Sequence, residues 1–363
     1  MSEKIKVGIT HGDINGIGYE VILKVLEDNR ILELCTPVVY GSAKIAANYR
    51  KLLGMANIPF NQIESAADAN DEANNIVNVV PEELRAEPGV ASQEAGQAAF
   101  AALERAVADL KSGDIDVLVT APINKASIQS ESFTFPGHTE YLEAALGEDK
   151  DSKALMILCN DRIRVALVTT HLPIAKVPAA ITKEAVLEKL ELFSRSLKRD
   201  FGIHQPRIAV LSLNPHAGEN GLLGAEEGEV IAPAIAEARE HKILAFGPYA
   251  TDGFFGSGAF SKFDGILAMY HDQGLAPFKS LAMDNGINFT AGLPYVRTSP
   301  DHGTGYDIAG KGEASEESMR EAIYQAIDIF RHRQSYDEAH RQPLRRLYHE
   351  KGSDNVVLDL SGE

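Results

Sequence analysis

Three histidines in this chain each follow a short apolar, β-branched run that predicts a buried strand. The predicted strands and the histidines after them are Ile163–Thr169 with His171, Arg207–Leu213 with His216, and Gly265–Met269 with His271. Because ligands bind beyond the carboxyl ends of strands in open α/β sheets, we expect the three imidazoles on one rim. Three imidazoles can hold a divalent cation and leave coordination positions open for a substrate.

The spacing of these histidines does not by itself identify a metal site. They are separated by 45 and 55 residues, unlike any zinc-finger motif, and each could instead cap a helix or fill a loop. His11 also follows a predicted strand and is a fourth candidate. The remaining histidines outside recognisable motifs are interpreted as surface residues: His204, His241, His332, His340 and His349.

A second group of polar residues, Gly137-His138-Thr139-Glu140, opens a predicted helix. A helix N-terminus offers unpaired N–H donors and a partial positive charge, which suit an anionic or polyhydroxyl ligand. His138 and Thr139 are therefore candidate substrate contacts. An ordinary N-cap by Thr139 explains the same residues equally well.

Two cations and an amide, Lys279, Asn288 and Arg297, lie among apolar residues and glycines further along the chain. In a protein of net charge −17, an anionic substrate needs a local cationic pocket, and these residues could form one. Two solvated surface cations are the alternative. Asp252 and Asp272 flank the same region and could orient ligands or move protons, although an aspartate in a loop is more often a turn residue.

The sequence supports neither of the common nucleotide-binding motifs. Residues 12–18 follow the first predicted strand but do not fit G-x-G-x-x-G, and no other segment fits it. Residues 305–312 approach a P-loop, but Gly312 stands where a Ser or Thr must bind magnesium, and no strand directly precedes them.

The elements that must position these residues alternate short strands with long amphipathic stretches, which predicts an α/β fold with a largely parallel sheet. Further strands are expected at Ile5–Thr10, Val38–Tyr40 and Asp116–Thr120. Helices are expected at Gly18–Leu26, Ser92–Lys111, Thr139–Leu146, Lys183–Arg199, Ala225–Arg239 and Ser315–Arg331. We interpret residues 61–75 as surface loop and helix, residues 247–312 as loop-rich, and the charged tail after Tyr336 as peripheral.

Composition restricts the classes of function. Lys and Arg number 35 against 52 Asp and Glu, which argues against binding to nucleic acid or to an anionic membrane surface. A hydrophobic fraction of 44% in 363 residues is typical of a globular protein of about two domains. Two cysteines cannot form a disulfide framework, and no apolar run approaches 18 residues. We therefore expect a cytoplasmic protein.

Several motifs together carry a family resemblance. They are Gly12-Asp13 with Gly16-Ile17-Gly18, Gly137-His138-Thr139-Glu140, residues 214–219, Tyr270-His271-Asp272-Gln273-Gly274 and residues 297–304. The combination resembles the 4-hydroxythreonine-4-phosphate dehydrogenase family, enzymes of pyridoxal phosphate biosynthesis, over about residues 6–330. The first loop departs from the family pattern, because it lacks the usual prolines after Asp13 and before Glu20.

The resemblance implies a fold similar to the isocitrate and isopropylmalate dehydrogenases, with two α/β/α domains and the active site in the cleft between them. Residues 1–145 with 295–363 would form the first domain, and residues 146–294 the second. It also implies a homodimer with shared active sites, in which the metal ligands His171, His216 and His271 come from both subunits. The implied substrate contacts are His138, Thr139, Lys279, Asn288 and Arg297, and the implied cofactor contacts are His302, Gly303, Thr304 and Asp307.

The implied reaction is the oxidation by NAD or NADP of a phosphorylated hydroxy-amino acid, 4-phosphooxy-L-threonine, followed by decarboxylation to 3-amino-2-oxopropyl phosphate. One Zn, Co or Mg ion per site would assist. Lys279, Asp252 and Asp272 are the candidate catalytic residues, with proton transfer assigned to Lys279 or Asp252. Three alternatives stay open: a sister dehydrogenase acting on erythronate or threonate 4-phosphate, a three-histidine metal hydrolase, and a binding protein without activity.

Overall fold

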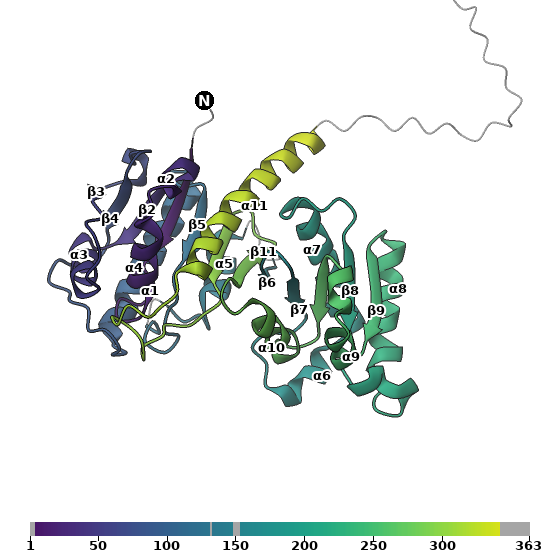
Figure 1. Ribbon diagram of the computed structural model, residues 1–363. Helices are drawn as coiled ribbons and strands as arrows, with labels where there is room; N and C mark the ends of the chain where they lie inside the picture. Colours follow the sequence, from purple (N-terminus) through teal and green to yellow (C-terminus); the bar gives the residue numbers. More distant parts are fainter. Residues whose placement is uncertain (1–3, 131–132, 148–152, 342–363) are drawn as a thin grey trace, which may run out of the picture.

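A twelve-stranded sheet runs through the protein in the computed structural model, which describes residues 4–130, 133–147 and 153–341 (Figure 1). The strands are β1 Ile5–Thr10, β2 Cys35–Gly41, β3 Phe60–Ile63, β4 Asn74–Asn78, β5 Val117–Thr120, β6 Leu155–Cys159, β7 Arg164–Leu167, β8 Arg207–Leu211, β9 Leu244–Tyr249, β10 Gly265–Ala268, β11 Ile287–Ala291 and β12 Val296–Pro300. Their order across the sheet is β3-β4-β2-β1-β5-β12-β11-β6-β7-β10-β8-β9.

The helices are α1 Gly18–Leu26, α2 Ile31–Leu34, α3 Ala43–Leu52, α4 Gln93–Ser112, α5 His138–Leu146, α6 Val177–Ala180, α7 Lys183–Arg199, α8 Ala232–Glu240, α9 Thr251–Gly256, α10 His271–Ala282 and α11 Glu317–Arg341. Short 3-10 turns are η1 Ala66–Asp68, η2 Ile174–Lys176, η3 Pro215–Gly221 and η5 Ala259–Lys262, and η4 Glu227–Ile231 is a π-helical turn. Within the described ranges, no helix is long and apolar enough to cross a membrane.

The three strands that precede the candidate metal ligands lie side by side. β10 pairs in parallel with β7 on one side and with β8 on the other, so the segments after these strands begin at one edge of the sheet. Antiparallel pairing is confined to β11 with its two neighbours and to β6 with β7. The predicted α/β fold with a largely parallel sheet is confirmed. The predicted division into residues 1–145 with 295–363 and residues 146–294 stays a prediction.

Local sequence signals explain where the long helices begin. The Ser92 hydroxyl accepts a hydrogen bond from the Ala95 N–H at 3.2 Å and caps α4, and the Thr182 hydroxyl caps α7 through the Ala185 N–H at 3.1 Å. Such caps satisfy N–H groups that have no partner within the helix. The helix predicted at Lys183–Arg199 has those bounds in the structure.

Two polar stretches fold differently from the sequence expectation. Residues 61–75 were expected to be loop and helix, but they contain most of β3, the short turn η1 and the start of β4. The buried Asn75 side chain explains why polar residues form an ordered edge here, because it donates to the Pro37 carbonyl at 3.1 Å and accepts from the Asn70 N–H at 2.9 Å. Similarly, the helix expected at Ala225–Arg239 is interrupted by the π turn η4 before α8 begins.

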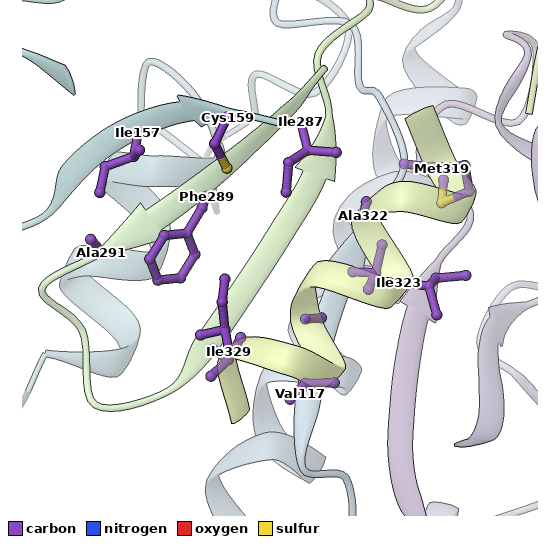
Figure 2. Packing of buried hydrophobic residues seen from close by; sticks show 14 of the residues in the cluster. Val117, Ile157, Cys159, Ile287, Phe289, Ala291, Met319, Ala322, Ile323 and Ile329 are labelled. Carbon is purple, nitrogen blue, oxygen red and sulfur yellow. The ribbon is translucent and has the colours of Figure 1, made fainter. Parts of the chain in front are cut away.

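The helix α11 covers the middle of the sheet, where it packs against β5, β11 and β12 (Figure 1). Met319, Ala322 and Ile323 recur at three- and four-residue steps on one face of α11, and all three are buried. Figure 2 shows this face together with Val117 on β5 and Phe289 on β11, the strand on the far side of β12. Each large apolar side chain buried here contributes roughly 1.5–3 kcal/mol.

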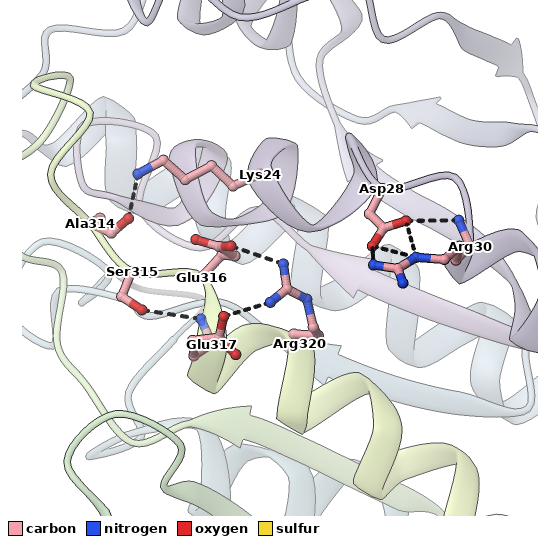
Figure 3. Close-up of polar contacts among 8 residues, drawn as sticks. All are labelled: Lys24, Asp28, Arg30, Ala314, Ser315, Glu316, Glu317 and Arg320. Atoms are coloured by element: carbon pink, nitrogen blue, oxygen red, sulfur yellow. Dashed lines mark hydrogen bonds and ion pairs between the residues drawn. The ribbon is translucent and has the colours of Figure 1, made fainter.

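Charged residues fix the start of α11 against α1 (Figure 3). The Lys24 ammonium donates to the Ala314 carbonyl, and Glu20 accepts from both Lys24 and the Ala314 N–H at 2.9 Å. Arg320 pairs with Glu316 at 2.9 Å and with Glu317 at 2.7 Å. These contacts hold the segment that leads from the predicted cofactor residues into α11.

Candidate active site

A cavity of about 540 Å³ lies where β5, β11 and β12 meet the first turns of α5 and α10. The predicted site residues that line it are His138, Thr139, His171, His271, Asp272, Lys279, Asn288, Arg297, His302 and Gly303. Those that do not line it are His216, Asp252, Thr304 and Asp307. The fold therefore brings all five predicted substrate contacts into one space, together with two of the three predicted metal ligands.

Arg297 is a buried cation in the wall of this cavity, only 2% exposed. Its guanidinium donates to the Thr120 hydroxyl at 2.6 and 3.1 Å and to the Thr290 hydroxyl at 3.1 Å, and it forms no ion pair with any described residue. Burial lowers the pKa of Arg297 to about 9, so the side chain is still charged at neutral pH. A buried cation whose partners are neutral favours an anion in the adjoining cavity.

The N-terminus of α5 faces the same cavity. Gly137 is the N-cap residue and has no side chain, so the alternative in which Thr139 caps this helix is wrong. The first N–H groups of α5 thus receive no side-chain cap from the N-cap position. Burial lowers the pKa of His138 well below its ordinary value, and the cations Arg297 and Lys125 lower it further. A neutral His138 can offer one hydrogen-bond donor and one acceptor to a ligand.

His171 and His271 lie together, with ring centroids 6.0 Å apart. The Nδ1 atom of His271 is 2.7 Å from an oxygen of Asp272, and the Nδ1 atom of His171 is 3.5 Å from an oxygen of Glu140. A carboxylate that accepts the Nδ1–H fixes the tautomer of an imidazole and leaves the lone pair of Nε2 free to bind a metal, which is how metal-ligating histidines are commonly held. The two residues fit a divalent-cation site in this respect, although the Lys125 ammonium lies 3.4 Å from Nε2 of His171.

A buried glutamine and a threonine tie together the ends of the strands that carry the histidines. The Gln273 amide donates to the Ser212 carbonyl at 2.5 Å and to the Thr251 hydroxyl at 2.9 Å, and its oxygen accepts from the Met269 N–H at 2.7 Å. The Thr169 hydroxyl donates to the Met269 carbonyl at 2.8 Å. The ends of β7, β8 and β10 are therefore held in fixed relative positions.

His216 lies outside the cavity, on the turn η3, and its side chain is exposed. In the described ranges, no group of three or more His, Cys, Asp and Glu side chains is arranged to hold a metal ion. One chain therefore brings together two of the predicted ligands, and the shared three-histidine site stays a prediction.

Lys279 is paired with a partly buried acid at the cavity wall. Its ammonium lies 3.7 Å from a carboxylate oxygen of Asp301, and burial raises the pKa of that carboxyl despite the attraction of Lys279. Asp252, the other candidate for proton transfer, is exposed at the start of α9 and accepts a hydrogen bond from the Gly253 N–H. Of the two candidates for proton transfer, Lys279 and Asp252, only Lys279 borders the cavity.

The predicted cofactor segment rests on the first glycine-rich loop. The Ile17 N–H donates to the Thr304 carbonyl at 2.9 Å, and the Tyr306 hydroxyl donates to Asp13 at 2.6 Å. A Cβ on Gly16 would stand 2.7 Å from the Thr304 carbonyl oxygen, so only glycine allows this approach. The glycines of the first loop thus serve close backbone packing, and the loop supports residues 302–307 without the prolines usual in the family.

His302 lines the cavity and has one buried nitrogen without a hydrogen bond to any described residue. Its Nδ1 is 3.1 Å from the Gly303 carbonyl oxygen, while Nε2 is buried and has no hydrogen-bond partner among the described residues. Burial lowers the pKa of His302, which keeps the ring neutral. Buried polar atoms are rarely left without a hydrogen bond in folded proteins.

Sequence reasoning missed several residues that shape this site. Lys125 and Asp301 line the cavity, and Glu140 and Gln273 hold the histidines and the strand ends. Glu140 and Gln273 are part of the motifs quoted above, so they could have been singled out. Lys125 stands alone after β5 and carries no comparable signal.

The model of one protein family, described as pyridoxal phosphate biosynthetic protein PdxA, matches residues 33–326. The chain belongs to this family. A 4-hydroxythreonine-4-phosphate dehydrogenase from Bacteroides thetaiotaomicron is 59% identical over 358 residues, which cover 98% of this chain and 97% of the relative. A relative from Oceanobacillus iheyensis, named provisionally as a D-threonate 4-phosphate dehydrogenase, is 39% identical and aligns over 91% of this chain and 99% of its own length.

A solved structure has the same fold. The crystal structure of 4-hydroxythreonine-4-phosphate dehydrogenase from Klebsiella pneumoniae matches with a TM-score of 0.76 at 35% identity, covering 90% of this chain and 100% of that chain. The family inferred from the motifs and the predicted α/β fold class are both confirmed.

Proposed function

We propose that the protein oxidises 4-phosphooxy-L-threonine with NAD or NADP and releases CO2, giving 3-amino-2-oxopropyl phosphate. The name of the 59% identical relative supports this substrate. The reaction converts the secondary alcohol to a ketone, which leaves a β-keto acid that loses CO2 readily. A three-histidine hydrolase and a binding protein without activity have no comparable support from the relatives.

The observation that carries the proposal is the buried guanidinium of Arg297 at the cavity, which is bonded to two hydroxyl groups and has no ion-pair partner in the part of the chain that the structure describes. The substrate has two anionic ends, a phosphate and a carboxylate, and Arg can grip either through two parallel N–H bonds. Lys279, His138 and Thr139 add donors around the same space, and Asn288 also lines it. The cavity therefore suits a small, polar, multiply charged anion better than an apolar ligand.

We assign the divalent ion, Zn, Co or Mg, to His171, His216 and His271, with ligands contributed by both subunits of a homodimer. When bound, the ion would lower the pKa of the substrate alcohol and stabilise enolate charge, while the nicotinamide would accept the hydride. Asp272 and Glu140 orient the imidazoles of His271 and His171.

The chain itself supplies proton transfer and cofactor binding. Lys279 borders the cavity and, in its neutral amine form, is the group we assign to take the alcohol proton, in preference to the exposed Asp252 outside it. The cofactor is assigned to His302, Gly303, Thr304 and Asp307, of which the first two line the cavity. The contacts of the first loop with Thr304 and Tyr306 hold this segment in place.

One experiment separates the main proposal from its nearest alternative. The rate of reduced-nicotinamide formation is followed by absorbance with 4-phosphooxy-L-threonine, D-threonate 4-phosphate and D-erythronate 4-phosphate as substrates. We expect the highest kcat/KM with 4-phosphooxy-L-threonine. A higher value with D-threonate 4-phosphate would assign the chain to the activity named for the Oceanobacillus relative, and a higher value with D-erythronate 4-phosphate would assign it to a sister dehydrogenase of that substrate. Turnover of a phosphate ester without nicotinamide would overturn the dehydrogenase proposal.

A further inference from the structure

The turn that carries His216 has an uncommon backbone. His216, Ala217, Gly218, Glu219 and Asn220 all have positive φ angles, between 43° and 76°. The left-handed region is unfavourable for every residue except glycine, and a run of such residues persists only where the surroundings impose it. Strained backbone of this kind clusters at functional sites. The structure must therefore contain a group that holds this turn.

The buried carboxylate of Glu227 contacts the residues that precede this turn. Glu227 is 5% exposed, and one of its oxygens accepts hydrogen bonds from the backbone N–H of Leu213 at 2.8 Å and of Asn214 at 2.7 Å. Its second oxygen accepts from the Asn214 side-chain amide at 3.0 Å. Hydrogen bonds to a carboxylate are stronger than those between neutral groups. Glu227 thereby fixes the two residues that lead into the turn.

The turn at Gly218 and the π turn η4 both pack closely at the Glu227 carboxylate. A Cβ on Gly218 would stand 2.6 Å from an oxygen of Glu227, so a larger residue at this position would displace the carboxylate or the turn. Glu227 begins the π turn η4, a rare element that is frequent at functional sites. The exposed imidazole of His216 makes no hydrogen bond with any residue in the described part of the chain. Its position is thus set by the backbone alone.

We propose that Glu227 is the positioning residue for His216: it imposes the left-handed turn and so presents the imidazole as a metal ligand. This inference rests on the metal site of the proposed function. Glu227 is not among the residues that line the cavity, and its hydrogen bonds are made to Leu213 and Asn214, so we expect it to act through the backbone of residues 213–220.

The test uses the full-length protein freed of metal by chelation, with Co²⁺ alone as the probe in equilibrium dialysis. Glu227→Ala is compared with Glu229→Gln, which removes a charge from an exposed residue of the same π turn. Loss of a residue that orients a metal ligand commonly weakens metal binding by 10- to 100-fold, so we expect a rise of at least roughly tenfold in the Kd of Glu227→Ala. Glu229→Gln should match the wild-type protein.

Two further measurements exclude a merely structural role. Hydrogen exchange at the Leu213 and Asn214 amides should accelerate in Glu227→Ala while exchange in β8 is unchanged. At saturating Co²⁺, kcat should return to within about twofold of wild type, because the ligand itself is intact. Glu227→Gln retains an oxygen acceptor for both amides and should lose less affinity than Glu227→Ala.

Each outcome is decisive. Equal Co²⁺ affinity of Glu227→Ala and the Glu229→Gln control overturns the role of Glu227 but leaves the metal site standing. Absence of Co²⁺ binding by the wild-type protein overturns the metal site and, with it, this role. If Glu227→Ala does not fold, Glu227→Gln decides alone, and Co²⁺ affinity and amide exchange equal to those of the control contradict the proposal.

Discussion

Replacement of Arg297 by methionine separates a binding role for this buried cation from a structural one. Burial lowers its pKa from the ordinary 12.5 to about 9, which corresponds to about 5 kcal/mol spent on keeping the charge inside the folded protein. The three hydrogen bonds to Thr120 and Thr290 return roughly 0.5–1.5 kcal/mol each. We therefore expect Arg297→Met to leave the free energy of unfolding unchanged or to raise it by up to about 3 kcal/mol.

The same substitution should damage substrate binding. Loss of one charge-assisted contact in a desolvated site costs about 2–5 kcal/mol, so the KM for 4-phosphooxy-L-threonine should rise at least roughly 30-fold. Arg297→Lys keeps the charge but not the two-pronged geometry, and should raise that KM at least roughly tenfold. The KM for NAD should change little with either variant, since the cofactor is assigned to residues 302–307.

The assays are urea denaturation and steady-state kinetics with each substrate varied in turn. Lys262→Met, which removes one exposed cation outside the cavity, controls for the change in net charge. A destabilised Arg297→Met protein with an unchanged substrate KM would show that the guanidinium serves the fold. A raised KM for NAD with an unchanged KM for the substrate would place Arg297 in the cofactor site.

The remaining predictions concern three other groups of histidines. His216→Ala should lose most bound Co²⁺ and most turnover at an unchanged Tm, and full activity in a verified metal-free variant would remove His216 from the ligand set. Mixed His171→Ala and His271→Ala proteins should regain part of the activity if the two ligands come from different subunits, whereas no recovery after proven subunit exchange would contradict that sharing. Burial lowers the pKa of His11 from 6.5 to about 4, so the folded protein binds this proton more weakly than the unfolded chain does. The contribution of neutral His11 to the free energy of unfolding is therefore complete above pH 6.5 and is lost as the pH falls toward 4. Urea denaturation should show that wild type loses about 2 kcal/mol more stability than His11→Phe between pH 7 and pH 5, and equal losses would refute this.

Hydrophobic pattern predicted the parts of the fold whose burial is decided locally. Amphipathic periodicity and capping residues placed α4 and α7, and apolar runs placed β1 and β10. The strands β11 and β12 and the helix α10 were missed, since α10 contains Pro277 and both strands lie in a glycine- and proline-rich stretch. Long-range pairing in the middle of the sheet overrides these local signals.

The candidate site was more predictable than the fold around it, because its residues belong to motifs. The rule that ligands bind beyond strand ends identified His171 and His271, which the structure brings together. Contacts that depend on tertiary structure could not be predicted: nothing in the sequence pairs Glu140 with His171 or sets Glu227 beneath the turn of His216. These partners are separated by more than ten residues and meet only in the folded chain.

We propose that this cavity couples oxidation of a phosphorylated hydroxy-amino acid to loss of its carboxylate with the help of a divalent ion. The most direct measurement quantifies NADH, CO2 and 3-amino-2-oxopropyl phosphate formed from 4-phosphooxy-L-threonine by the wild-type protein, with and without chelator. We predict equal molar amounts of the three products and loss of all three on chelation, with recovery when Co²⁺ or Zn²⁺ is added back. NADH formation without CO2, or full turnover in a chelated protein shown to contain no metal, would contradict the account.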